Sequence, residues 1–206
     1  MIVPNEMAAL RMTEDLNLLL DGRVRSLPAR ELTFLKAAAS SHGMTLRRME
    51  ALGDCATGKA AALVTGNRTA EAVARDYPEL PPEAIIRIGD FIDAALRAAE
   101  TARLERIVLG CMTGKLFKYA CGDRNTHAAN TKLDLTRLEE FGVKLPGVPL
   151  EKLHTTGELA AQLTPEEFRA IQRRLHEAAL RLLSGRHPGI RLEIALYDDR
   201  KEKILS

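Results

Sequence analysis

Three turns that combine glycine with polar side chains hold most of the potential chemistry in this sequence. They are residues 65–69 (TGNRT), 89–90 (GD) and 110–115 (GCMTGK), and each follows a short apolar run. In parallel α/β sheets, ligands bind beyond the carboxyl ends of the strands, where the next helix begins and its backbone N–H groups point outward. One such glycine is as often a plain tight turn. Three in succession predict a site at Gly66, Gly89 and Gly110.

The third turn resembles a phosphate-binding P-loop but does not satisfy the motif. The P-loop needs four residues between its glycines and a hydroxyl side chain after its lysine. Here three residues separate Gly110 from Gly114, and Leu116 follows Lys115. No G-x-G-x-x-G follows any of the apolar runs, so the standard dinucleotide fingerprint is also missing. The sequence therefore argues against an NTPase.

Basic side chains gather around and after the third turn, at Lys115, Lys118, Arg124 and Lys132. A solvated basic face is the default interpretation of such a group. The sharper one is a site for a polyanionic small molecule, because Lys115 would lie in a first helical turn, which favours negative charge. His127 lies in the same stretch. It is a candidate general base or anion ligand, or a side chain that bonds a backbone carbonyl.

Cysteine and histidine show no metal-binding or disulfide pattern. Cys55, Cys111 and Cys121 are far apart, which fits a reducing compartment, and Cys111 is more typical of a buried core residue than of a nucleophile. Neither cysteine nor histidine has the spacing of metal ligands, so we expect no metal. The remaining histidines are expected to be solvated or peripheral: His42, His154, His176 and His187.

Composition narrows the class of partner. Tryptophan is absent, aromatic residues are 4%, and 30 Lys and Arg are interspersed with 28 Asp and Glu, so no nucleic acid is expected. No stretch approaches the roughly 18 apolar residues of a membrane span, and the amino terminus has no basic segment followed by an apolar run. We therefore expect a cytoplasmic protein that does not associate with membranes.

The apolar runs and the stretches between them predict the fold. Strands are expected at 61–66, 84–89 and 106–110, and helices at 69–77, 90–104 and 114–121. Strands that alternate with helices indicate βαβ units. The expected fold class is therefore α/β: a three-layer, mainly parallel sheet with helices on both faces, plus a C-terminal helix and strand.

The C-terminal helix and strand have the clearest local signals. Thr164, Pro165 and Glu167 predict a capped helix start, and Gly185 predicts its end. Residues 190–197 alternate between apolar and polar, which is typical of a strand buried on one face. Residues 143–157, with two prolines and two glycines, are interpreted as a loop or lid.

The amino-terminal part is harder to interpret. A helix is expected at about 28–40, and residues 1–21 are either a helix or an arm. We expect two units: an N-terminal helical segment, residues 1–58, and an α/β domain, residues 59–206.

Five segments in order resemble the cobalt-precorrin-5B C1-methyltransferase family of the anaerobic cobalamin pathway. They are TGNRTAEAV (65–73), IIRIGDFIDAALRAA (85–99), IVLGCMTGKLFKYACG (107–122), NTHAANTKLDL (125–135) and the closing strand LEIALYDDRKEKIL (192–205). The resemblance covers about residues 60–206. Members of that family are longer, residues 5–58 match poorly, and Asp93 stands where the family has a glycine.

The resemblance implies methyl transfer from S-adenosylmethionine to C1 of a cobalt-containing macrocycle rich in carboxylates. It implies cofactor contacts at Gly66, Asn67, Gly89 and Asp90, substrate contacts at Arg68, Lys115, Lys118, Arg124 and Lys132, and polarisation or deprotonation of the macrocycle by Thr113 and His127. Alternatives remain open: a non-catalytic corrinoid- or nucleotide-binding protein, or a partner subunit. A homodimer, or a complex that supplies the missing domain, is also expected from the shortened chain.

Overall fold

The computed structural model describes residues 11, 14, 60–127 and 131–206. The helix expected at 28–40 and the residue Cys55 lie outside the described residues, and so does the segment 1–21 apart from residues 11 and 14. Where the chain is described, no helix is both long and apolar enough to span a bilayer.

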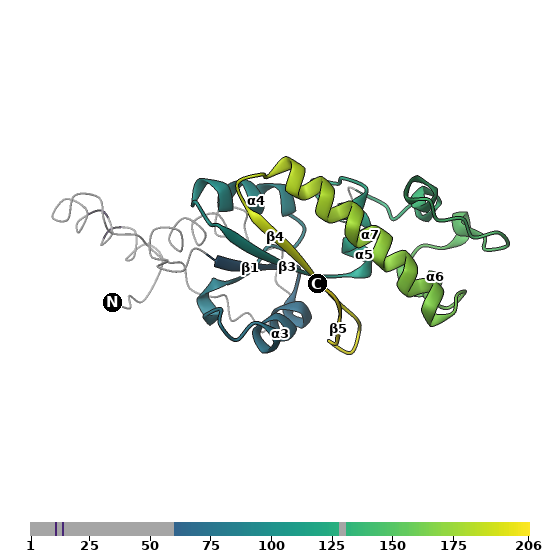
Figure 1. The fold of residues 1–206 in the computed structure, drawn as a ribbon, viewed down its shortest axis with the longest axis horizontal. Helices are drawn as coiled ribbons and strands as arrows, with labels where there is room; N and C mark the ends of the chain where they lie inside the picture. Colours follow the sequence, from purple (N-terminus) through teal and green to yellow (C-terminus); the bar gives the residue numbers. More distant parts are fainter. Residues whose placement is uncertain (1–10, 12–13, 15–59, 128–130) are drawn as a thin grey trace.

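A five-stranded sheet forms the centre of the described structure (Figure 1). Its order is β2-β1-β3-β4-β5, in which the first four strands are parallel and β5 is antiparallel to β4. The strands are β1 (Ala60–Val64), β2 (Ile85–Arg87), β3 (Arg106–Met112), β4 (Arg191–Tyr197) and β5 (Lys203–Leu205).

Helices cover both faces of this sheet, which confirms the predicted three-layer α/β fold. The α-helices are α3 (Asn67–Asp76), α4 (Ile92–Thr101), α5 (Thr113–Ala120), α6 (Thr156–Ala160) and α7 (Pro165–Arg186). The short 3-10 helices are η1 (Pro82–Ala84), η2 (Leu135–Phe141) and η3 (Leu150–Lys152). Helix α3 packs on one face, and α4, α5 and α7 pack on the other (Figure 1).

Alternate side chains of each central strand enter two different cores. In β1, Leu63 packs with α4, α5 and α7, whereas Val64 packs with α3. Strands covered on both faces are apolar on both faces. The expectation that residues 190–197 are buried on one face is therefore wrong for the end of β4, where Ala195 and Tyr197 are as buried as Ile194.

The prediction of a third glycine turn is wrong, because Gly110 lies within a strand. Strand β3 continues through Gly110 to Met112, and α5 follows without a loop. A Cβ atom at Gly110 would lie 2.7 Å from Cγ2 of Val73 and 3.1 Å from Cγ1 of Val64. The glycine therefore lets α3 pack closely against the sheet.

In the C-terminal part, the predicted start of the helix is confirmed, whereas its predicted end and the single closing strand are wrong. Helix α7 begins as predicted, with reciprocal capping bonds between Thr164 and Glu167. It continues through Gly185 to Arg186, so the glycine is not its end. The closing segment 192–205 is two strands rather than one, because the chain turns at Asp198, whose Oδ1 accepts bonds from two backbone N–H groups.

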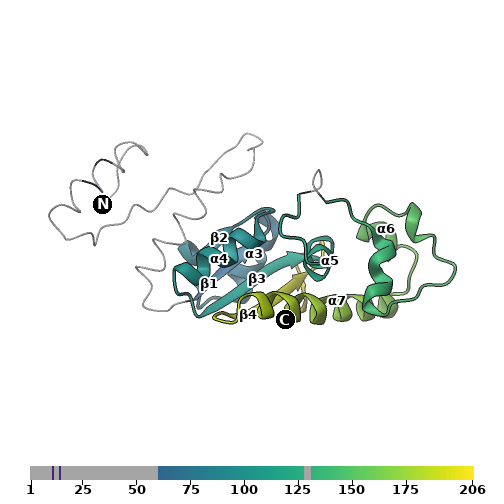
Figure 2. The ribbon, with the colours of Figure 1, turned by 90° about the horizontal axis from the view of Figure 1, so that it is seen from above.

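Residues 135–163 extend beyond the carboxyl end of the parallel strands (Figure 2). They contain η2, η3 and α6, joined by irregular segments, and return the chain to the start of α7. The predicted loop at 143–157 is therefore interrupted by η3 and includes the start of α6. This extension forms one wall of the pocket described next.

Candidate functional site

A pocket of about 860 Å³ opens at the carboxyl ends of β2 and β3. Four segments line it: the turn after β2, the start of α5, the irregular stretch after α5, and the residues before α6. The lining residues are Asp90, Met112, Gly114, Lys115, Lys118, Thr126, His127, Thr131, Lys132, Leu133, His154, Thr155 and Thr156.

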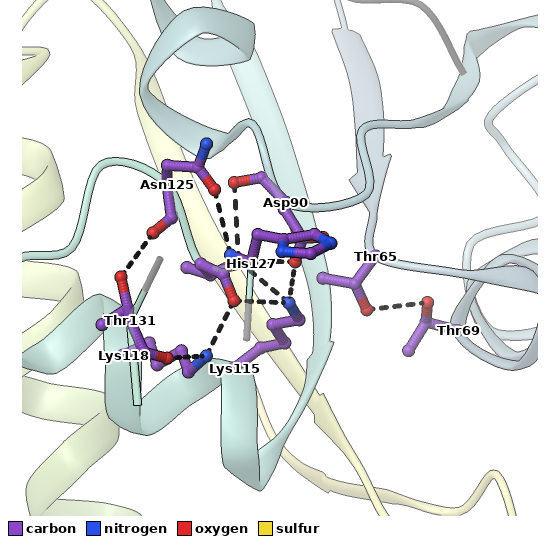
Figure 3. Close-up of polar contacts among 9 residues, drawn as sticks. Thr65, Thr69, Asp90, Lys115, Lys118, Asn125, His127 and Thr131 are labelled. Carbon is purple, nitrogen blue, oxygen red and sulfur yellow. Dashed lines mark hydrogen bonds and ion pairs between the residues drawn. The ribbon is translucent and has the colours of Figure 1, made fainter. Parts of the chain in front are cut away.

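An ion pair between Asp90 and Lys115 crosses the pocket wall (Figure 3). The Lys115 ammonium donates to Oδ1 of Asp90, to the carbonyl oxygen of Thr126 at 3.1 Å and to the hydroxyl of Thr126 at 3.0 Å. An ammonium has three N–H donors, so each of them has an acceptor. Burial raises the pKa of Asp90, but the bond and charge of Lys115 outweigh it and hold that pKa below its usual value.

Thr126 connects this ion pair to the loop that carries His127. Its side chain is fully buried, and its hydroxyl donates to Oδ1 of Asp90 at 3.1 Å. Its backbone N–H donates to the carbonyl oxygen of Asp90 at 3.0 Å. Sequence reasoning gave Thr126 no role in the site, although the family resemblance included it together with His127 in the segment 125–135.

Lys118 is a buried lysine, with 8% of its surface exposed. Its ammonium donates to the carbonyl oxygens of Thr126 and Thr131, both at 2.8 Å (Figure 3). Burial and the neighbouring charge of Lys115 lower the pKa of Lys118. This lysine is therefore tied to the main chain of the loop.

His127 and Lys132 line the same pocket from that loop. The backbone N–H of His127 donates to Oδ1 of Asn125 at 3.0 Å, and the charge of His127 contributes to the lowered pKa of Asp90. Lys132 is exposed, and it makes no hydrogen bond or ion pair with another described residue. It is thus a lysine of this wall whose ammonium is open to a ligand.

The two confirmed glycine turns lie at strand ends but outside the lining of this pocket. Gly66 is the N-cap of α3, directly after β1, and Gly89 follows β2 with a φ of 56°, a conformation that favours glycine. Asn67 accepts a hydrogen bond from Arg87 through its Oδ1. Asp90 belongs to both regions, because it directly follows Gly89 and also lines the pocket.

Three further predicted site residues have other neighbours and are also absent from the lining. The hydroxyl of Thr113 is largely buried and accepts a bond from Nε2 of Gln172 at 2.9 Å. Nη1 of Arg68 lies 3.8 Å from Oδ1 of Asp199. Nε of the exposed Arg124 lies 3.9 Å from Oδ1 of Asp93.

The histidines that were expected to be peripheral differ from one another. His154 lines the pocket, beside Thr155 and Thr156. His187 is 4% exposed, with Nδ1 3.0 Å from a carboxylate oxygen of Glu100, and His176 bonds the carbonyl oxygen of Ile194. The expectation is wrong for His187, which is buried, whereas His154 is exposed and His176 is half-buried; His42 lies outside the described residues. Within residues 60–127 and 131–206, no three His, Cys, Asp or Glu side chains gather as metal ligands do.

The fold and the pocket define a class: an α/β protein with a lysine-rich pocket at the carboxyl edge of its parallel strands. Three lysines and one aspartate line the pocket, together with two histidines. The first turn of α5 also borders it, and no side chain caps the backbone N–H groups there. Charged donors and a helix N-terminus both favour a carboxylate or phosphate.

Similarity to known proteins points to a particular family. The chain is 31% identical over 148 residues to the cobalt-precorrin-5B C(1)-methyltransferase of Polaromonas sp. (strain JS666), covering 68% of this chain and 40% of that protein. It is 34% identical over 147 residues to the enzyme of that name from Nitratidesulfovibrio vulgaris, covering 66% and 37%. It is 39% identical over 87 residues to that of Polaromonas naphthalenivorans, covering 42% and 24%.

These similarities confirm the resemblance found in the sequence. The C-terminal portion of the chain is related to the cobalt-precorrin-5B C(1)-methyltransferases. The chain spans 40% of the length of the first of these relatives and less of the other two. No family model and no solved structure matches it significantly.

Proposed function

We propose that the pocket binds a corrinoid precursor through its carboxylates and that the protein methylates C1 of cobalt-precorrin-5B, with S-adenosylmethionine as the methyl donor. One observation carries this proposal: a pocket with three lysines and one aspartate lies at the carboxyl edge of the sheet, in a chain whose relatives bear that enzyme name.

The substrate side of the proposal rests on the charges of the pocket. A carboxylate gains most from a donor that is not already paired, because a paired ammonium must first give up its partner. Lys132 has no partner among the described residues, whereas Lys115 and Lys118 hold acceptors of the protein itself. Lys132 is therefore the leading carboxylate contact, with Lys115, Lys118, Arg68 and Arg124 contributing long-range attraction.

We propose that S-adenosylmethionine binds beside the pocket, at the carboxyl ends of β1 and β2. Gly66 and Gly89 follow β1 and β2 and have no side chain, so a ligand can approach the backbone at these positions. Asn67 is the first residue of α3, directly after Gly66. Asp90 follows Gly89 and lines the pocket. Its Oδ1 is held by Lys115 and Thr126, so Oδ2 is the oxygen proposed to accept from the amino or ribose groups of the cofactor. We keep Gly66, Asn67, Gly89 and Asp90 as the proposed contacts of S-adenosylmethionine.

The reaction asks more of alignment than of acid–base groups. S-adenosylmethionine supplies a sulfonium methyl: a macrocycle carbon contributes the electron pair of the new bond while the methyl–sulfur bond breaks. Holding two reactants in line contributes on the order of 7–11 kcal/mol to such a step. His127 is the proposed group that polarises or deprotonates the macrocycle, because it lines the pocket. Thr113 is proposed to act through the position of α5, since its hydroxyl already binds Gln172.

The surroundings of this enzyme are part of the proposal. We propose a cytoplasmic protein with an N-terminal unit at 1–58, an α/β domain at 59–206, and no nucleic-acid partner. A homodimer, or a complex with a partner that adds a companion domain at the site, is also part of the proposal.

Methyl transfer by the chain tests the proposal. The purified protein is incubated with cobalt-precorrin-5B and methyl-labelled S-adenosylmethionine, and the macrocycle is recovered and analysed by mass spectrometry. We expect label in the macrocycle, strongly reduced in Lys132→Met and unchanged in Lys144→Met, an exposed lysine outside the pocket. Corrinoid binding without label would contradict the catalytic proposal and favour a non-catalytic binding protein.

A further inference from the structure

The three lysines of the pocket differ in what their ammonium groups already hold. Lys132 is exposed and has no partner among the described residues. Lys115 has an acceptor for each donor. Lys118 is 8% exposed, and it holds two backbone carbonyl oxygens at 2.8 Å. The loop therefore occupies two of the three N–H donors of Lys118.

The two carbonyls that Lys118 holds belong to the residues directly before His127 and Lys132 in the pocket wall. Thr126 directly precedes His127, and Thr131 directly precedes Lys132. Described residues of this stretch have no helix or strand ladder to fix them. Irregular backbone must be held by side chains or by its own turns. Lys118 supplies one charged donor to both positions.

Further bonds complete the same arrangement from the loop side. The N–H of Thr131 donates to the carbonyl oxygen of His127 at 2.9 Å, and its hydroxyl donates to that of Asn125 at 2.9 Å. The N–H of Thr126 donates to the carbonyl oxygen of Asp90 at 3.0 Å. The wall is thus anchored to α5 through Lys118 and to the turn after β2 through Asp90 (Figure 3).

We infer that Lys118 is a positioning residue: it holds the loop through the carbonyls of Thr126 and Thr131, so that His127 and Lys132 face the pocket, and it does not itself bind the ligand. The inference rests on the proposed function only for the nature of the ligand, a carboxylate. The anchoring of the loop stands on contacts within the chain.

Amide hydrogen exchange of the ligand-free 206-residue chain tests the anchoring directly. In Lys118→Met we expect the amides of Thr126 and Thr131 to exchange faster by about tenfold or more, because local opening becomes easier. The amide of Val108 in β3 and both loop amides in Lys132→Met are expected to keep their native rates. Lys118→Arg, which retains charged donors, is expected to restore much of the protection. Unchanged loop amides in Lys118→Met would overturn the inference. If this variant fails to fold, Lys118→Leu, which also lacks a donor, replaces it with the same expected and contradicting results.

Binding of a carboxylate-rich probe separates positioning from contact. Uroporphyrin, a stable porphyrin with many carboxylates, is titrated by its fluorescence at several salt concentrations. Loss of a contacting charge weakens both affinity and its salt dependence. We expect that result for Lys132→Met, whereas Lys118→Met loses affinity with a clearly smaller change in salt dependence and is rescued by Lys118→Arg. Equal loss of salt dependence in both Met variants would assign Lys118 to the ligand and overturn the inference. If native protein does not bind uroporphyrin, the anionic ligand of the proposed function is contradicted, and hydrogen exchange alone decides the role of Lys118.

Discussion

Asp90 and Lys115, 25 residues apart in the sequence, form an ion pair at the carboxyl ends of β2 and β3. Thr126 bonds to both, so the turn after β2, the first turn of α5 and the following loop are joined at one point. The pair is partly buried, with side chains 23% and 28% exposed respectively. It therefore acts as a structural brace of the pocket as well as part of its charge.

The lowered pKa of Asp90 predicts a defined dependence of stability on pH. A carboxyl group whose pKa is lower in the folded protein stabilises it above the unfolded-state value, here 3.8, and this contribution disappears as the pH falls through the folded-state value. The unfolding free energy of Asp90→Asn should thus be lower than native at neutral pH, and the difference should shrink below pH 3.8. Urea unfolding across the acidic range measures it.

Asp123 is the matched control, with the opposite sign. Burial raises the pKa of its carboxyl group, so its charge opposes folding above the folded-state pKa. Asp123→Asn is expected to gain stability relative to native as the pH rises from 3.8 toward neutral. A constant difference from native at every pH, for both variants, would contradict the assigned shifts.

Two glycine substitutions of identical chemistry should change stability in opposite directions. Gly110→Ala places a Cβ atom 2.7 Å from Val73, and overpacking of this kind costs about 1–3 kcal/mol. Gly185→Ala meets no atom within 4 Å near the end of α7, where alanine is favoured over glycine by about 0.5–1 kcal/mol. Thermal and urea unfolding of both variants tests the comparison. A stable Gly110→Ala protein would show that α3 is not held closely against β3.

Cys111 and Cys121, the two cysteines in the described part of the chain, are expected to react poorly while the protein is folded. Burial raises the pKa of Cys111 to about 12 and is the main cause that raises the pKa of Cys121 to about 11. Because the thiolate is the reactive form, iodoacetamide at mildly alkaline pH should alkylate Cys111 only after unfolding, and Cys121 slowly before it. Peptide mass spectrometry resolves the two sites. Equal labelling of Cys111 in folded and unfolded protein would restore it as a candidate nucleophile.

The bond from Gln172 to Thr113 predicts coupled losses of stability. It is buried between α5 and α7, so removing one partner leaves the other unsatisfied at a cost of about 1–3 kcal/mol. We expect Thr113→Val and Gln172→Leu each to lose stability, and the double variant to lose less than their sum. A double-mutant cycle in urea measures this coupling. Additive losses would show that the two side chains act independently.

The placement of the site at one edge of the sheet was predictable, because it depends on local signals in the sequence. Apolar runs ending near Gly66 and Gly89 indicated parallel strands, and residues placed after such strands share one edge of the sheet. That reasoning found Asp90 and Lys115, and the basic stretch after the third turn added His127; all three line one pocket.

The remaining parts of the site depend on tertiary contacts that leave no periodic signal. Lys118 looked like a solvated or ligand-binding lysine, because nothing in its spacing reveals the two carbonyls that it holds. Gly110 looked like a turn, because only the packing of α3 shows why a side chain is excluded there. His154 reaches the pocket because residues 135–163 return past the sheet edge, a path that composition does not specify.

The cobalt of the proposed substrate allows the most direct test of where the macrocycle binds. Crystals of the chain grown with cobalt-precorrin-5B would be measured at the cobalt absorption edge, so that anomalous scattering locates the metal of the bound ligand. The account predicts a cobalt peak inside the pocket bounded by Asp90, Lys115 and Lys132, with a substrate carboxylate at Lys132. A macrocycle bound elsewhere on the protein, with this pocket filled by solvent, would contradict it.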